Sequence, residues 1–211
     1  MAATDAEIVN LALNNLGLTQ YIATLADATK EARAALKVYA PARKRFIARW
    51  PWKFAQRRAV LAVADPLVAD ELTTLDGWAA VYKVPATCIK AIKFFTGYRT
   101  EAHDDRAPFE LGMSDDGSTN VILCDLGNSS TQPILHFRID VTDPTKFPYY
   151  FDDAFSWEIA DLLAMPLRVD EKIAKLTKLR AAMALESALA DQRSERYEDE
   201  EPDAEHIRAR I

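Results

Sequence analysis

The sequence is poor in the residues that mark fibrous, metal-bound or membrane-spanning chains. Six glycines and ten prolines among 211 residues exclude collagen-like and low-complexity classes. The two cysteines, Cys88 and Cys124, have no clustered partners and fit buried thiols rather than a zinc site. No apolar run approaches the ~20 residues that a membrane span needs, and the N-terminus lacks the layout of a secretory signal. We therefore expect no membrane anchor and synthesis in a reducing cytoplasm.

The residues that are present indicate a globular chain with an uneven charge distribution. Hydrophobic residues make up 49% of the sequence and charged residues 27%, enough for one sizeable core. The net charge of −6 argues against a chain that binds nucleic acid with its whole surface. However, residues 30–58 hold ten basic residues against one acid, and residues 191–203 hold seven acids against two arginines. Such opposite blocks favour contacts within a subunit or between copies.

Helical patterns occupy both ends of the chain. Thr4 and Glu7 form a capping box at the start of a predicted helix. Apolar residues then recur at helical spacing until Gly17, which is predicted to end the helix. A second pattern covers 24–50, where Pro41 should kink or briefly break the helix and Pro51 should end it. Its apolar face is predicted to comprise Ala32, Ala35, Leu36, Tyr39, Phe46, Ile47 and Trp50.

Two more helices are predicted near the C-terminus. In the first, Asp152 or Asp153 caps a helix that Pro166 ends, with four residues facing inward: Phe155, Ile159, Leu162 and Leu163. Asp170 caps the second, over 169–193. Residues 194–211 have no apolar period and are predicted to be a flexible tail.

The middle of the chain changes from helical to strand-like patterns. Short apolar runs read as strands at 78–85, 88–95, 109–113, 120–126 and 133–140, and the turn "SDDGST" predicts a hairpin between the third and fourth. We therefore predict an α+β protein that is mostly an α-helical bundle (1–59 and 150–193). An inserted antiparallel β subdomain (60–149) and an extended C-terminal tail (194–211) complete it.

No pattern of catalytic residues is found. His103, His136 and His206 lie far apart in the sequence, and none of them has the spacing to another ligand that metal sites show. The sequence also has no nucleophile elbow and no phosphate-binding glycine loop. Carboxylates near turns could form a glycosidase pair or a calcium site, but turn chemistry explains them better: Glu110, Asp115, Asp116 and Asp125. We expect no enzyme, catalytic residue, cofactor or metal.

The stretch "ARWPWKFAQRR" (48–58) combines aromatic and basic residues at a predicted helix end. We interpret Trp50, Trp52 and Phe54 as a core hinge between helices and strands. The surrounding cations are interpreted as solvated, intersubunit or channel-lining charge: Arg43, Lys44, Arg45, Arg49, Arg57 and Arg58.

Four segments in order resemble the tail tubular protein A-like adaptors of short-tailed phages, also called head completion or tail accessory proteins. The segments are "NLALNNLGL", "DATKEARAALKVYAPARKRFIARWPWKFAQRRAVL", "GWAAVYKVPATCIK" and "PYYFDDAFSWEIADLLAMPL", and the resemblance covers residues 6 to 190. It implies a non-enzymatic head-to-tail connector, a ring typically of twelve copies beneath the portal vertex of the virion. Such a ring extends the channel through which genomic DNA passes and offers a docking surface to the tail nozzle and fibre proteins.

The resemblance also implies that the C-terminal segment clasps the portal protein. Its last residues turn basic and apolar, which a purely solvated tail does not require. The portal-binding residues are predicted to be Tyr197, His206, Ile207, Arg208, Arg210 and Ile211.

Two other functions stay open at this point. One is a helical nucleic-acid-binding protein that uses the basic segment 30–58, for which DNA affinity should depend steeply on salt. The other is a hydrolase that uses carboxylates of the β subdomain, for which changing Glu110 or Asp125 should abolish activity.

Overall fold

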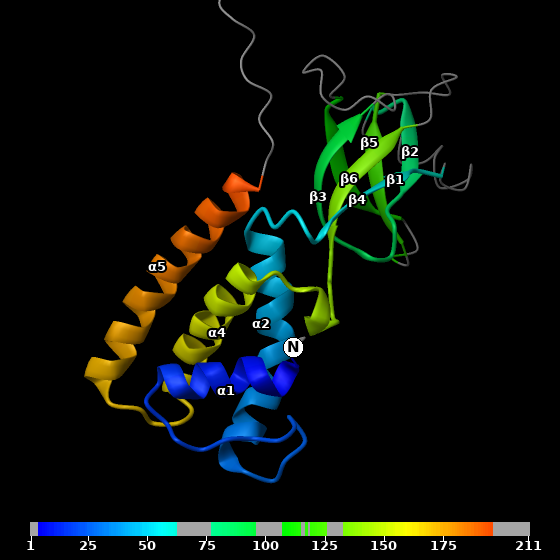
Figure 1. Ribbon diagram of the computed structural model, residues 1–211. Coiled ribbons are helices and arrows are strands. Elements are labelled where there is room, and N and C mark those ends of the chain that lie inside the picture. Colours follow the sequence, from blue (N-terminus) through cyan, green and yellow to red (C-terminus); the bar gives the residue numbers. More distant parts are fainter. Residues whose placement is uncertain are drawn as a thin grey trace, which may run out of the picture. The chain divides into compact units, whose positions relative to one another are not determined.

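The computed structural model describes residues 4–62, 77–95, 107–114, 117, 119–125 and 133–195 (Figure 1). Its contacts divide the chain into two compact units. The helical unit comprises Met1–Ala42 and Asp143–Ile211, and the sheet unit comprises Arg43–Thr142. The first division falls inside helix α2 (Lys30–Arg49), whereas the sequence places that boundary after residue 59.

Local signals set the ends of the first helices. In α1 (Asp5–Asn15) both hydrogen bonds of the capping box between Thr4 and Glu7 form, which confirms the prediction. Gly17 follows with φ +74°, the left-handed conformation that glycine adopts without steric cost. Helix α2 starts after Thr29, whose hydroxyl accepts a hydrogen bond from the Ala32 amide. It continues through Pro41, so the break considered from the sequence does not occur.

The C-terminal helices follow a short 3-10 turn, η2 (Pro144–Lys146). Helix α4 (Tyr149–Ala164) has Pro148 at its N-cap, so the prediction of an aspartate cap is wrong there. The helix starts earlier than predicted because Pro148 at the cap has a fixed φ that suits this position. Proline also has no backbone N–H that would need a hydrogen-bond acceptor. Helix α5 (Glu171–Ser194) is capped by Asp170, which accepts from the Lys172 amide as predicted.

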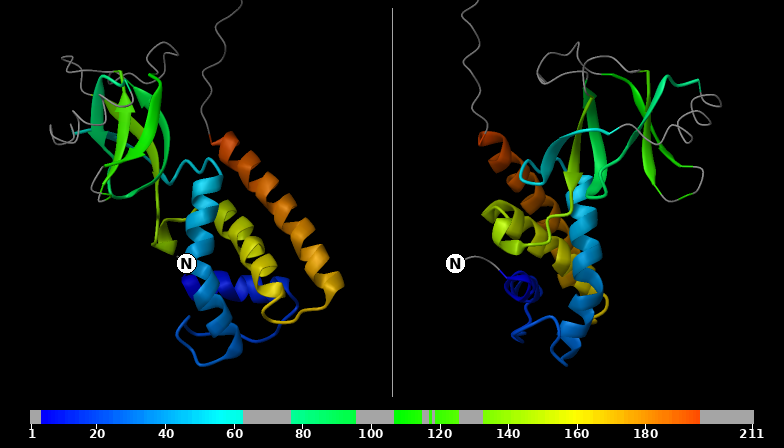
Figure 2. Two further views of the ribbon diagram at one scale, coloured as in Figure 1. Left: turned by 180° about the vertical axis from the view of Figure 1, so that it is seen from behind. Right: turned by 90° about the vertical axis from the view of Figure 1, so that its right-hand side faces the viewer.

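Helix α4 is the centre of the helical unit. Helices α1 and α5 both pack against it, and α5 runs alongside it in Figures 1 and 2. The ring of Phe155 on α4 lies 5.5 Å from that of Tyr39 on α2 and 5.5 Å from that of Phe151. Leu36, predicted to face inward, is exposed.

The sheet unit contains two three-stranded antiparallel sheets. Sheet A has the order β1-β6-β3, with β1 at Gln56–Val60, β6 at Ile134–Ile139 and β3 at Cys88–Phe95. Sheet B has the order β2-β5-β4, with β2 at Ala80–Lys83, β5 at Asn120–Cys124 and β4 at Phe109–Met113. The hairpin of β4 and β5 agrees with the prediction, whereas β1 was not predicted as a strand.

The two sheets share one core. Tyr82, Ile122 and Cys124 of sheet B form a buried cluster with Phe94, Leu135 and Phe137 of sheet A. Alternation along β6 turns Leu135 and Phe137 into this core and His136 and Arg138 onto the opposite face. On that opposite face the end of α2 is held by Arg138, whose guanidinium donates to the Ala48 carbonyl at 2.6 Å. A cation at the carbonyl end of a helix also complements the helix dipole.

The fold class needs one correction. Helices account for 47% of the described residues and strands for 21%, which makes this a mixed α+β fold and not a mostly helical bundle. The prediction was wrong because it treated the strands as an insert. The strands build a core of their own between two sheets, and the C-terminal end of α2, from Arg43 to Arg49, belongs to that unit.

Candidate functional site

Helix α5 carries several of the large apolar side chains that stay exposed in the described part of the helical unit. Four apolar side chains, spaced three, three and four residues apart, lie on one face: Ile173, Leu176, Leu179 and Met183. Leu176, Leu179 and Met183 are each more than half exposed. We call these four residues the α5 stripe. A contiguous apolar patch of this kind marks an interaction surface, because isolated exposed leucines are common but aligned ones are not.

The opposite face of α5 explains why the stripe points outward. The covered residues of α5 are mostly small, with Thr177 and Ala188 buried and Ala174, Ala181 and Ala184 half-buried. Larger covered side chains are Gln192, which is buried, and Leu185 and Leu189, which are half-buried. Small side chains let two helices approach closely but bury little apolar area. The four residues of the α5 stripe are therefore not needed for this packing, and they stay exposed to a partner.

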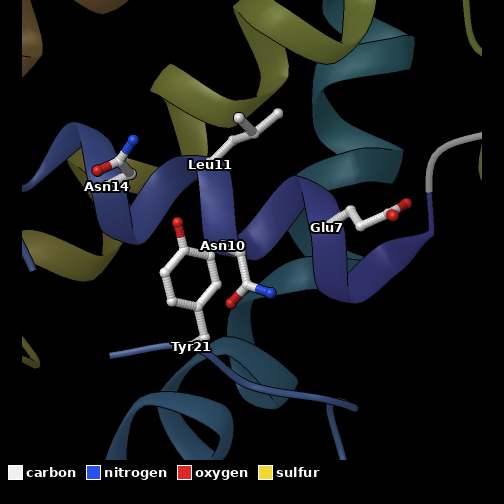
Figure 3. A pocket seen from close by; sticks show the side chains of 5 residues that line it. All are labelled: Glu7, Asn10, Leu11, Asn14 and Tyr21. Carbon is white, nitrogen blue, oxygen red and sulfur yellow. The ribbon is translucent and has the colours of Figure 1, made fainter. Parts of the chain in front are cut away.

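A second surface lies on α1 and the loop that follows it. Glu7, Asn10, Leu11, Asn14 and Tyr21 line an open hollow of about 390 Å³, in which the ring of Tyr21 points toward α1 beside Asn10 (Figure 3). The Asn10 side chain holds the loop through two 2.9 Å hydrogen bonds to the amide and the carbonyl of Ile22. These lining groups contain one carboxylate and no nucleophile paired with a base. Leu11 and Tyr21 give the hollow an apolar lining that can contact another surface.

The six cations singled out from the sequence fall into two groups. Arg43 is buried and forms a two-pronged ion pair with Asp140, with nitrogen–oxygen distances of 3.1 and 3.2 Å. The other five side chains are exposed: Lys44, Arg45, Arg49, Arg57 and Arg58. Arg49 lies over the ring of Trp50, 5.1 Å from its centroid. Arg43 therefore serves the sheet unit internally, and only the others are accessible to an outside partner.

The three aromatic residues of the predicted hinge differ in burial. Trp52 is fully buried, and its indole N–H donates to the Phe46 carbonyl at 3.1 Å. Its ring lies 5.3 Å from that of Phe46 and 6.4 Å from that of Phe54. Trp50 and Phe54 are half-buried. The chain thus turns from α2 into β1 around Trp52.

Several predicted residues lie outside the described part of the chain. These are the candidate portal-binding residues Tyr197, His206, Ile207, Arg208, Arg210 and Ile211, together with Asp115 and Asp116. Glu110 lies on β4, and Asp125 follows β5. Within the described ranges no three His, Cys, Asp or Glu side chains gather as a metal ion would require.

The exposed α5 stripe was not predicted from the sequence. The spacing of its apolar residues is visible in the sequence, but an apolar stripe normally predicts the buried face of a helix. The signal that could have found it is the second, alanine-rich face of the same helix.

Neither a scan against models of protein families nor a comparison with curated proteins finds a match to this chain. Among the described residues, every helix is too short or too polar to cross a bilayer.

Proposed function

We propose that the protein is a structural subunit of a virion, a head-to-tail adaptor whose copies form a ring between the portal vertex and the tail. The observation that carries the proposal is the α5 stripe. Four large apolar side chains kept in water weaken the case for an isolated monomer, since covering them is the main source of association energy. The order of the four sequence segments that resemble phage adaptors supplies the biological setting.

A second copy of the chain is the occupant that the surfaces favour. The helical unit has two dissimilar surfaces, the α5 stripe and the hollow at Leu11 and Tyr21. Lysines flank the stripe at positions 172, 175 and 178, and Glu7 lies at the hollow. The stripe of one copy would contact the apolar lining of the hollow on the next copy. At the edge of this contact the lysines beside the stripe would lie near Glu7 of the hollow. Such a head-to-tail contact closes into a ring when the rotation per subunit allows it.

The first experiment measures the mass of the purified protein in solution by light scattering, alone and mixed with a portal protein. The proposal expects a ring in one of the two samples. A variant with Leu176→Gln and Leu179→Gln keeps good helix formers on α5 but removes its apolar surface. We expect it to remain folded by circular dichroism and to lose assembly.

The matched control is Leu111→Thr on β4, because Leu111 is exposed to 53% and Leu176 to 54%. Its assembly should equal that of the unchanged protein. Assembly that survives the double change on α5 would contradict the role of the stripe. A monomer that ignores portal and binds DNA with a steep salt dependence would favour the alternative, a nucleic-acid-binding protein that uses residues 30–58.

A further inference from the structure

Sheet A has a row of cationic side chains across all three of its strands. The register pairs Arg58 of β1 with His136 of β6, and His136 in turn with Lys93 of β3. Directly paired residues of antiparallel strands point to the same face, with Cβ atoms about 4.5–5.5 Å apart. Arg58 is exposed, and His136 and Lys93 are half-buried. We call these three residues the His136 row.

Irregularities in β3 enlarge this cationic face. In a regular strand, residues 90 and 93 would point to opposite faces because side chains alternate. The register shifts between Ala91 and Lys93, so that Lys90 pairs with Arg138 and Lys93 with His136. Both lysines therefore share the face of the His136 row. Bulges of this kind re-aim side chains and are frequent beside functional sites.

No described carboxylate forms an ion pair with this row. Asp140 directly follows β6, the strand of His136, but Arg43 donates to both of its carboxylate oxygens. Like charges placed directly opposite each other in a sheet destabilise it. Burial, and then the neighbouring charges of Arg58, Lys93 and Arg138, lower the pKa of His136. A sheet that accumulates such repulsion is suited to a ligand of opposite charge.

We propose that the His136 row binds a phosphate group, with Arg58 and Lys93 contributing positive charge and His136 a hydrogen bond. Arg58 can donate two parallel hydrogen bonds to phosphate oxygens, and Lys93 acts as a compact charge on the other side. The site belongs to the sheet unit alone and does not depend on the adaptor function. The phosphate could be free or part of a nucleic acid backbone, and the experiment separates these two sources.

Binding should be coupled to protonation of His136. Without ligand, the groups that face it are the cations Arg58 on β1, Lys93 on β3 and Arg138 on β6, all of which disfavour the imidazolium. A bound phosphate reverses the sign of the local field and favours that imidazolium. For the oligonucleotide, whose phosphodiesters keep one negative charge each over this range, affinity should therefore rise as the pH falls from 8 to 6, with uptake of a proton by His136 on binding. Inorganic phosphate itself gains a proton in this range, so the pH test uses the oligonucleotide.

The test follows the imidazole resonances of His136 by NMR while inorganic phosphate, or a twelve-nucleotide DNA of mixed sequence, is added to the full chain. We expect selective shifts of His136 and an increase of its pKa at saturation. Arg58→Gln and Lys93→Gln should each weaken binding by about tenfold. Lys83→Gln, which removes an exposed cation from sheet B, is the matched control and should bind as the unchanged protein does.

The outcomes distinguish the sources of phosphate. Binding of inorganic phosphate with no gain from the oligonucleotide assigns the site to a free phosphate. Tighter binding of the oligonucleotide, weakened by the row variants and by salt, assigns it to a nucleic acid backbone. The proposal is overturned if neither ligand shifts His136, or if Lys83→Gln weakens binding as much as Arg58→Gln does. A separate readout without ligand is the pKa of His136 itself, which should rise in Arg58→Gln because one neighbouring cation is removed.

Discussion

Replacing Asp152 with asparagine should stabilise the protein at neutral and alkaline pH. Asp152 lies in the first turn of α4, half-buried, and its Oδ1 atom finds no hydrogen-bond partner within the described structure. Burial raises the pKa of this carboxyl from 3.8 to about 7. The charged form is therefore the disfavoured one in the folded state, and an amide of the same shape avoids that charge.

The sign and size of the effect follow from linkage. Between pH 4 and 7 the folded state keeps a proton on Asp152 that the unfolded state has released, so the contribution of this group to stability is most favourable below pH 4 and declines as pH rises to 7. The gap between the two pKa values corresponds to about 4 kcal/mol. Partial exposure of the group and the favourable field at a helix N-terminus both reduce it. We expect the free energy of unfolding of Asp152→Asn to exceed that of the unchanged protein by about 2 kcal/mol at pH 8.

The assay is urea unfolding at pH 5 and pH 8, followed by circular dichroism at the helix band. Asp152→Asn should gain stability at pH 8, gain less at pH 5, and flatten the pH dependence between them. Asp153→Asn, the exposed neighbour in the same turn, is the control and should leave that dependence unchanged. If the pH profiles of Asp152→Asn and the unchanged protein run parallel, then Asp152 does not titrate near neutral pH and the reasoning fails.

Two further substitutions test the helical unit and the sheet unit separately. Tyr150→Phe removes the 3.0 Å hydrogen bond from the phenol to the Glu195 carboxylate and should cost about 1 kcal/mol of unfolding free energy, whereas Tyr149→Phe at an exposed position should cost almost nothing. Urea titrations of the two variants side by side check this, and equal values would refute it. Trp52→Leu deletes the buried ring and its bond to the Phe46 carbonyl and should cost about 3 kcal/mol in the same assay, so a loss below 1 kcal/mol would contradict its place in the core.

The ends of elements could be predicted where a single residue makes the signal. Thr4, Gly17 and Asp170 each act through a hydrogen bond or a backbone angle within a few residues, and the structure has all three as predicted. The strands of the hairpin were recognisable for the same reason, because β4 and β5 are neighbours in sequence. Local chemistry of this kind needs no knowledge of the fold.

Features that depend on distant partners could not be predicted. The segment "QRRAV" has no apolar alternation, and it is a strand because β6, more than seventy residues later, supplies its hydrogen bonds. The bulges of β3 depend on the same strand, so the shared face of Lys90 and Lys93 is invisible in the sequence. Tertiary pairing also made the strands a unit with its own core, which the sequence-based fold class underestimated.

The basic block of residues 30–58 therefore cannot be treated as one surface. Arg43 neutralises Asp140 within the sheet unit, so its removal would leave a partly buried carboxylate without its partner and destabilise the protein. Arg58 stands opposite a histidine that it disfavours as a cation, so its removal should relieve repulsion. A variant that neutralised the whole block would combine a loss of stability with a loss of binding. Single substitutions that leave Arg43 in place are the ones that can separate an outside partner from the interior of the fold.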